Sequence, residues 1–310
     1  MKKSILALLM VCLLLGGCAQ EKKKSQTVFA MDTVMELTVW GDDSAQAVQE
    51  LETLIADLEE KWSAQGDVAM LSALNEGDMP QAEMDRAFVE QVQALSSRTG
   101  GAFDPQLYSL MALWGFPTKQ YRVPTEIEIA QAMEVRHWDL GGAVKGYAGD
   151  LAVETLKEMD VDRAILNLGG NIQTYGSKAD GTPWSIGIQN PKGGQHLGVV
   201  AVKGTMAVVT SGDYQRYFEQ DGIRYHHILD PKTGSPAKSG LASVTVICKN
   251  GLTADALSTA LFVMGLEEAA KFWQESDDFE AVFVTAEGAI FATEGAKLSG
   301  CKFEVIRREN

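Results

Sequence analysis

Two adjacent histidines, His226 and His227, stand in a segment bounded by turn-forming residues. This segment covers residues 210–236 and also contains two carboxylates, Asp213 and Asp230. Residues 214–218 and 224–229 are predicted to form two strands around a Gln-Asp-Gly turn. An imidazole on such a hairpin is suited to act as a general base near neutral pH. A surface hairpin whose histidines only pack or cap is the alternative interpretation.

A second group is the sequence DLGGAVKG at residues 139–146, where glycines precede a predicted helix over residues 144–159. Backbone N–H groups and the helix dipole attract anions at such a position, and Lys145 adds a formal positive charge. The combination suits a phosphate or pyrophosphate, although neither GxxxxGK[ST] nor GxGxxG is present. A purely structural glycine turn into a helix would have the same sequence.

A third group is Asp255 and Thr259, four residues apart in a predicted helix over residues 253–264. Their spacing places both side chains on one face of a helix that is otherwise apolar, so each needs a polar partner. Oxygen ligands of this kind suit Mg²⁺ better than zinc. The alternative is a first-turn aspartate with a threonine that bonds back to its own helix.

Two glycine-containing turns complete the candidate residues, GAFDP at residues 101–105 and NLGGN at residues 167–171. Glycine allows the backbone to approach a flat ligand closely, which would place both turns in a binding site. Ordinary turn chemistry explains each sequence equally well when it is taken alone.

The elements that position these residues alternate between strand and helix periodicity. A strand is predicted over residues 28–40, helices over 44–61 and 83–98, and strands over 163–170, 184–188, 199–202, 207–210 and 243–248. A closing hairpin is predicted over residues 280–285 and 289–293. Because no repeat or Pro/Ser-rich linker divides the chain after residue 27, residues 28–310 are predicted to form one mixed α and β unit.

The N-terminus has the features of a lipoprotein signal peptide over residues 1–17. A basic start is followed by an apolar run over residues 5–15 that is too short for a permanent membrane span. The run ends in Leu-Gly-Gly-Cys, which predicts cleavage before Cys18 and lipid attachment to it. Residues 18–27 then form a polar, lysine-rich tether, so the protein is expected outside the cytoplasm on a bacterial membrane. An ordinary signal peptide with an incidental cysteine is the alternative.

Net charge and cysteine usage narrow the remaining function classes. A formal net charge of -15 argues against nucleic acid as a partner, because it repels a phosphate backbone. Cys248 and Cys301 could pair in an oxidising compartment, although the apolar run around Cys248 favours simple burial. No CxxC or Cys/His metal spacing occurs in the sequence.

Seven sequences in this order resemble the ApbE family of FAD:protein FMN transferases: AMDTVMEL, GGAFDP, DLGGAVKGYAGD, LNLGGNI, TSGDYQRYF, HHILDPKTGSP and ADALSTALFVMG. The resemblance covers about residues 28–295 and is most specific in DLGGAVKG, HHILDPKTG and ADALSTALFVMG. It implies one α+β catalytic domain over residues 28–310, ApbE-like and T-fold-like, with mixed, largely antiparallel sheets flanked by helices. A common family pattern has Met-Gly-Thr where this chain has Met31-Asp32-Thr33.

The resemblance also implies roles for individual residues. His227 matches the family's proposed base, helped by Asp255. The Mg²⁺ ligands would be the carbonyl of Gly142 and the side chains of Asp255 and Thr259. The residues expected at FAD are Met31, Ala102, Phe103, Asp104, Asp139, Lys145 and Ile228.

The implied reaction is the Mg²⁺-dependent transfer of FMN from FAD to a Thr or Ser hydroxyl of an acceptor protein, with release of AMP. The acceptors would be redox proteins outside the cytoplasm, at the periplasmic face of a Gram-negative membrane or at a Gram-positive cell surface. Two alternatives are a Mg²⁺-dependent FAD pyrophosphatase and a lipoprotein that binds FAD without chemistry.

Overall fold

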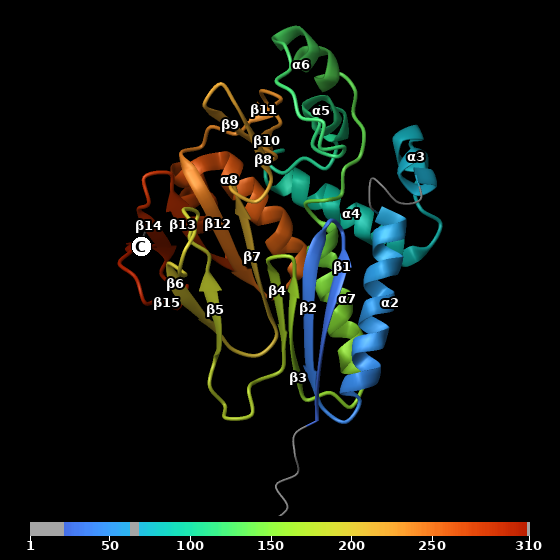
Figure 1. Cartoon of the computed structure of the whole chain (residues 1–310), viewed down its shortest axis with the longest axis vertical. Coiled ribbons are helices and arrows are strands. Elements are labelled where there is room, and N and C mark those ends of the chain that lie inside the picture. Colours follow the sequence, from blue (N-terminus) through green and yellow to red (C-terminus); the bar gives the residue numbers. More distant parts are fainter. Residues whose placement is uncertain (1–21, 63–67, 309–310) are drawn as a thin grey trace, which may run out of the picture.

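A nine-stranded sheet forms the centre of the protein in a computed structural model that describes residues 22–62 and 68–308 (Figure 1). Neighbouring strands are antiparallel except for the last pair, which is parallel. The strands, in sheet order, are β1 Lys23–Ala30, β2 Thr33–Trp40, β3 Arg163–Leu168, β4 Asn171–Tyr175, β7 Met206–Gly212, β12 Leu241–Cys248, β13 Phe279–Thr285, β14 Ile290–Thr293 and β16 Glu304–Ile306.

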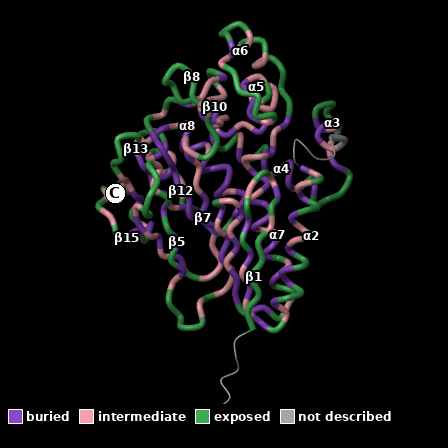
Figure 2. Tube along the Cα trace, in the orientation of Figure 1, coloured by how far each residue is buried: buried purple, intermediate pink, exposed green. Residues whose placement is uncertain are grey.

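Helices cover one face of this sheet and a smaller sheet covers part of the other. The helices are α2 Ser44–Trp62, α3 Val68–Glu76, α4 Glu83–Arg98, α7 Val144–Lys157 and α8 Gly251–Gln274. Apolar side chains from α2, α4 and α7 pack against β2 and β3, and those of α8 pack against β7, β12 and β13. The smaller sheet consists of β5 Trp184–Ile188, β6 Gly198–Val202 and β15 Leu298–Ser299. The interior of both layers is buried (Figure 2).

A separate group of short elements, the cap region, lies at one end of the sheet, at the top of Figure 1. It consists of α5 Tyr108–Trp114, α6 Glu126–Met133, β8 Tyr217–Gln220, β9 Ile223–His226, β10 Leu229–Asp230 and β11 Ser235–Pro236. Trp114 holds it together, because its indole packs on Tyr225 with 5.5 Å between ring centroids and donates a hydrogen bond of 2.9 Å to the carbonyl of Gly234.

The mixed, largely antiparallel architecture expected from the sequence is confirmed, but the single strand predicted over residues 28–40 is wrong. The chain reverses at Met31 and Asp32, whose φ angles of 50° and 60° form a two-residue turn between β1 and β2. Met31 therefore lies in a turn and not in a strand. Strand β1 begins at Lys23, inside the range assigned to the tether, whereas residues 1–21 lie outside the described residues.

Other elements also differ in detail from those predicted. The turn at Gly169 and Gly170 was expected, but the strand that follows it, β4, was not. The helix predicted over residues 253–264 is present as the first part of α8, which is interrupted at Gly265 with φ 77° and ψ 171° and then continues to Gln274. Cys248 and Cys301 are both free thiols. No helix in the described ranges is long and apolar enough to cross a membrane.

Candidate active site

A cavity of about 700 Å³ lies where the cap region meets the sheet and the helix layer. Segments from distant parts of the chain line it, among them the β1–β2 turn, the end of α2, the β3–β4 turn, the end of β7 and the first turns of α7 and α8. Every predicted site residue within the described ranges is found there: Met31, Ala102, Phe103, Asp104, Asp139, Gly142, Lys145, His227, Ile228, Asp255 and Thr259. Cys18 lies outside those ranges.

Helices α7 and α8 approach each other through glycine backbone, and this contact positions Asp255. A Cβ atom on Gly146 would lie 2.2 Å from the carbonyl oxygen of Gly251, so no larger residue fits. The backbone N–H of Gly146 donates a hydrogen bond of 2.9 Å to Oδ2 of Asp255, which is 4% exposed. Asp255 belongs to α8, but its buried side chain is hydrogen-bonded to the backbone of α7.

The hydroxyl of Thr259, one turn after Asp255 on α8, lies close to Gly142 and to Ser211. A Cβ atom on Gly142 would lie 3.9 Å from Oγ1 of Thr259, which places the Gly142 backbone next to that hydroxyl. The Oγ1 of Thr259 is also 3.3 Å from Oγ of Ser211 at the end of β7. The hydroxyl that bonds back to the carbonyl of Asp255 is Ser258 and not Thr259, so the back-bonding alternative does not apply to Thr259.

The chemistry of this donor set fits a hard divalent cation. One carboxylate, one hydroxyl and one backbone carbonyl are oxygen ligands of the kind that Mg²⁺ takes when phosphates and water complete its shell. The described part of the chain contains no group of three or more His, Cys, Asp or Glu side chains that could hold a metal. The donor set consists of oxygen atoms alone and lacks the nitrogen and sulfur ligands typical of zinc.

Lys145 and Asp139 shape the turn before α7. The Nζ of Lys145 donates a hydrogen bond of 3.1 Å to the carbonyl of Gly141. The Oδ1 of Asp139 accepts a hydrogen bond of 2.9 Å from the N–H of the same glycine. Lys145 has no carboxylate partner within the described ranges, so its positive charge is available to an anion in the cavity.

His227, which follows β9 in the cap region, is held in a defined tautomer. Its Nδ1 lies 3.1 Å from the carbonyl oxygen of Arg216, which can only accept, so Nδ1 carries the hydrogen and Nε2 keeps a free lone pair. Burial, reinforced by the positive charge of Arg216, holds the pKa of His227 well below its usual range. The imidazole is therefore neutral at physiological pH and able to accept a proton.

The neighbouring His226 points elsewhere. Its ring packs edge-on against Phe262 with 5.5 Å between centroids, and its Nε2 lies 3.1 Å from the carbonyl of Ala237. It is 8% exposed and does not line the cavity. Asp230 is also structural, because its Oδ1 accepts a hydrogen bond of 2.9 Å from the N–H of Lys232 within the β10–β11 turn. Of the four polar groups singled out in residues 210–236, only His227 lines the cavity.

The remaining predicted residues form the wall nearest the β1–β2 turn. Phe103 is buried, and its ring approaches within 3.4 Å of a Cβ position on Gly142. The N–H of Met31 donates a hydrogen bond of 2.6 Å to Oε1 of Glu59 on α2. Asp104 forms an ion pair of 2.6 Å with Arg136, which occupies its carboxylate. Aspartate at position 32, where glycine is common, pairs with Lys119 at 3.1 Å on the cavity rim.

Several polar residues of the cavity had no predicted role. Four of them, Asn171, Ser211, Gln215 and Arg216, lie at or next to the ends of β4 and β7. Their sequence signal was their place in LNLGGNI and TSGDYQRYF, two of the sequences that carry the family resemblance.

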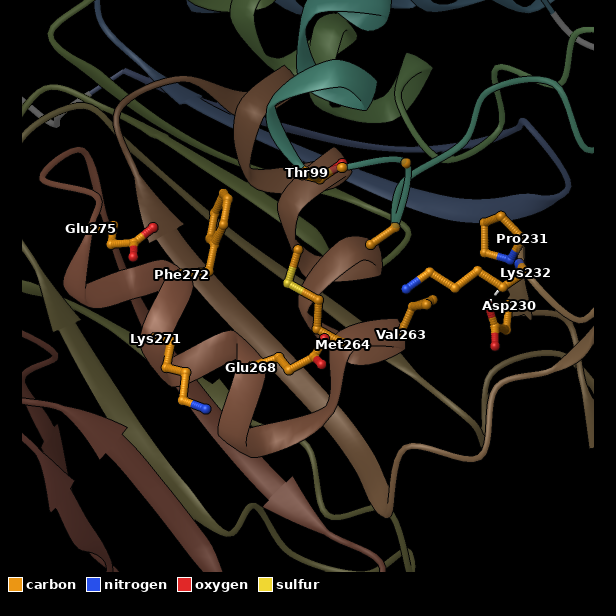
Figure 3. A pocket seen from close by; sticks show the side chains of 13 residues that line it. Thr99, Asp230, Pro231, Lys232, Val263, Met264, Glu268, Lys271, Phe272 and Glu275 are labelled. Atoms are coloured by element: carbon orange, nitrogen blue, oxygen red, sulfur yellow. Dashed lines mark hydrogen bonds between the residues drawn. The ribbon is translucent and has the colours of Figure 1, made fainter.

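A second cavity, of about 420 Å³, lies between the end of α4, the β10–β11 turn and the second half of α8 (Figure 3). Charged side chains of both signs, including Lys232, Glu268 and Lys271, surround Met264 and Phe272 there. Among the predicted site residues, only Ala102 lines it. The predicted chemistry therefore belongs to the first cavity.

In comparison with known proteins, the model of the ApbE family matches residues 31–283. The chain belongs to the ApbE family. It is 32% identical to the FAD:protein FMN transferase of Treponema pallidum, with 92% of each chain covered. It is 30% identical to the enzyme of the same name from Haemophilus influenzae, with 89% of this chain and 92% of the relative covered.

Solved ApbE structures share the fold. The ApbE protein from Thermotoga maritima superposes with a TM-score of 0.82 at 31% identity and covers 88% of this chain and 97% of its own. The apo flavinyl transferase ApbE from Pseudomonas stutzeri has a TM-score of 0.75 at 32% identity, with 91% and 95% covered. These likenesses confirm the ApbE-like α+β fold expected from the sequence.

Proposed function

We propose that this chain transfers FMN from FAD to a Thr or Ser hydroxyl of an acceptor protein and releases AMP. The observation that carries the proposal is the convergence of a neutral histidine, a buried aspartate, an unpaired lysine and a set of oxygen donors in one cavity. Relatives that cover nine-tenths of the chain are named FAD:protein FMN transferase. The cavity volume is in the range of small-molecule sites.

The proposed step is a direct displacement at phosphorus. Nε2 of His227 accepts the proton of the acceptor hydroxyl, and the hydroxyl oxygen attacks the FMN-side phosphorus of FAD. A phosphoester bond to the acceptor forms while the bond from this phosphorus to the bridging oxygen breaks, and AMP departs with the electron pair. No covalent enzyme intermediate is needed, so no cysteine or serine nucleophile is required. Asp255 assists by its negative charge in the same cavity.

The residues that would hold Mg²⁺ are Gly142, through its carbonyl, and Asp255 and Thr259, through their side chains. When bound, Mg²⁺ neutralises diphosphate oxygens and stabilises the charge that develops on the leaving group. Lys145 supplies a second positive charge at the start of α7, where the helix dipole already favours an anion. Met31, Ala102, Phe103 and Ile228 supply the apolar surface for the flavin nucleotide, and Asp104 and Asp139 fix the turns that border it.

The proposed setting is a membrane surface outside the cytoplasm. This part of the proposal rests on the N-terminal sequence, in which Cys18 follows a basic start and a short apolar run. Lipid attached to Cys18 would keep the catalytic domain near membrane-bound redox proteins. The expected acceptors are such proteins, and the net charge of -15 argues against nucleic acid.

Product analysis tests this function. The purified chain is incubated with FAD, Mg²⁺ and a purified acceptor domain of a membrane redox complex, and the acceptor is examined on a denaturing gel. Flavin fluorescence that stays with the acceptor band supports transfer. Free FMN and AMP with an unlabelled acceptor would identify a pyrophosphatase, and FAD that is bound but unchanged would identify a binding protein.

A further inference from the structure

Two unassigned polar residues of the cavity, Asn171 and Arg216, lack partners of their own. The carboxamide nitrogen of Asn171 is buried and has no hydrogen-bond partner in the described part of the chain, and the residue is 5% exposed. Arg216 is exposed and lines the cavity, and its guanidinium forms no ion pair or hydrogen bond with any described side chain. A buried donor without a partner is costly, so the retention of Asn171 points to an acceptor that arrives with a ligand.

Asn171 faces the helix-covered side of the sheet. It is directly opposite Val209 of β7, which packs with side chains of α8. Ser211, two residues further along β7, shares this face and contacts both Ser258 and Thr259 of α8, at 2.8 and 3.3 Å. The Asn171 side chain is therefore on the same face of the sheet as Ser211, whose hydroxyl contacts Thr259.

The segment that contains Arg216 contacts the residue next to Asn171 and is hydrogen-bonded to His227. A Cβ position on Gly170, next to Asn171, is 3.8 Å from Nε2 of Gln215, next to Arg216. Gln215 is anchored in turn by a hydrogen bond of 3.1 Å to the carbonyl of Thr210. The carbonyl of Arg216 accepts the hydrogen bonds from both the backbone N–H and Nδ1 of His227. The Arg216 backbone thus fixes the position of the base.

We propose that Asn171 and Arg216 form an oxyanion-binding subsite for the FMN-side phosphate, the group transferred in the function proposed above. An amide donor and a guanidinium suit the non-bridging oxygens of a phosphoryl group, on which negative charge is spread during transfer. The FMN-side phosphate is assigned because the base that activates the attacking hydroxyl is held by Arg216 itself. Lys145 and the donors at Gly142, Asp255 and Thr259 lie at the α7–α8 crossing and serve the rest of the diphosphate.

Binding of FMN, riboflavin and AMP to the purified chain tests the subsite without any need for turnover. Arg216→Gln and Asn171→Leu are each expected to weaken FMN binding, measured by flavin fluorescence titration, by about 10-fold or more. Riboflavin has the same ring system without the phosphate, so its affinity should stay unchanged. Asn171→Leu should leave the thermal midpoint unchanged or raise it, because it replaces an unpartnered buried donor by an apolar side chain of similar size.

Arg224→Gln is the matched control, since Arg224 is on the same hairpin but pairs with Glu219 at 3.3 Å outside the cavity. It should leave all three affinities unchanged. Equal loss of FMN and riboflavin binding in the two variants, loss of AMP binding alone, or no loss of FMN binding would each overturn the subsite. A wild-type chain that does not bind FAD would instead refute the proposed function, so the two failures are distinguishable.

Discussion

At the scale of single residues, His227 and His226 differ through their hydrogen-bond partners. Both Nδ1 of His227 and Nε2 of His226 face backbone carbonyls, but only His227 lines the cavity. Sequence spacing places the pair on a hairpin and cannot say which ring turns inward, because this depends on Phe262 and Arg216. The family resemblance pointed to His227, which is the ring that lines the cavity.

His227→Asn should lower the rate of FMN transfer by about 10²- to 10⁴-fold, because the attacking hydroxyl loses its base. In the wild type, a lowered pKa means that the neutral form persists to lower pH than in a free histidine. The acid limb of the transfer rate is therefore expected below pH 6.5, measured as initial rate against pH. A limb at or above that value would contradict the assignment, and His226→Asn should change stability without moving the limb.

At the scale of elements, the α7–α8 crossing determines where Asp255 and Thr259 lie. Sequence periodicity predicted both helices and placed Asp255 and Thr259 on one face. It could not predict the crossing, because Gly146 and Gly251 are far apart in the chain and each resembles an ordinary helix-start glycine. The turn at Met31 and Asp32 was missed for a related reason, since a left-handed turn normally signals itself by glycine.

Gly146→Ala should destabilise the protein, because the added methyl group would overlap the carbonyl of Gly251 at 2.2 Å. The expected loss in the free energy of unfolding is about 1–3 kcal/mol, as for other overpacked sites, measured by chemical denaturation. Gly142→Ala is the matched control for stability, because its Cβ would meet Phe103 only at 3.4 Å. Equal stability of both variants would show that the helices do not depend on this contact.

Asp150 of α7 should make stability depend on pH. It accepts hydrogen bonds from the N–H groups of Gly251 and Leu252 at the start of α8, at 2.6 and 2.9 Å. Burial raises its pKa to about 6, so the folded state favours the protonated form. Relative to Asp150→Asn, the wild type should lose stability as pH rises from about 4 to 6 and then level off, by about 3 kcal/mol at most. A difference in unfolding free energy that is constant between pH 4 and 8 would contradict this.

At the scale of the whole molecule, the nine-stranded sheet brings segments that are distant in the sequence together at the cavity. The sequence predicted one mixed α and β unit and most of its strands, because their alternation is strong. It did not predict β4 or the position of the cap region, because these depend on packing around Trp114 and Gly234 rather than on local periodicity. A role for Asn171 and Arg216 was not predicted, because the two residues come close only when β4 and β7 pair.

Cys18 should determine where the protein is found in the cell. In a bacterial host, the wild-type chain is expected in the membrane fraction, whereas Cys18→Ser should move it to the soluble fraction, because the lipid attachment site is lost. Immunoblots of separated fractions measure this. Equal partition of both forms would show that lipidation at this cysteine does not anchor the protein.

The most direct test of the transferase proposal is the ratio of AMP to protein-bound FMN after a single incubation with FAD, Mg²⁺ and acceptor domain. Chromatography measures AMP, and absorbance of the denatured acceptor measures bound FMN. The proposed step predicts equal amounts of the two in the wild type and a proportional loss of both in His227→Asn. Release of AMP together with free FMN, and no flavin on the acceptor, would contradict the transferase function.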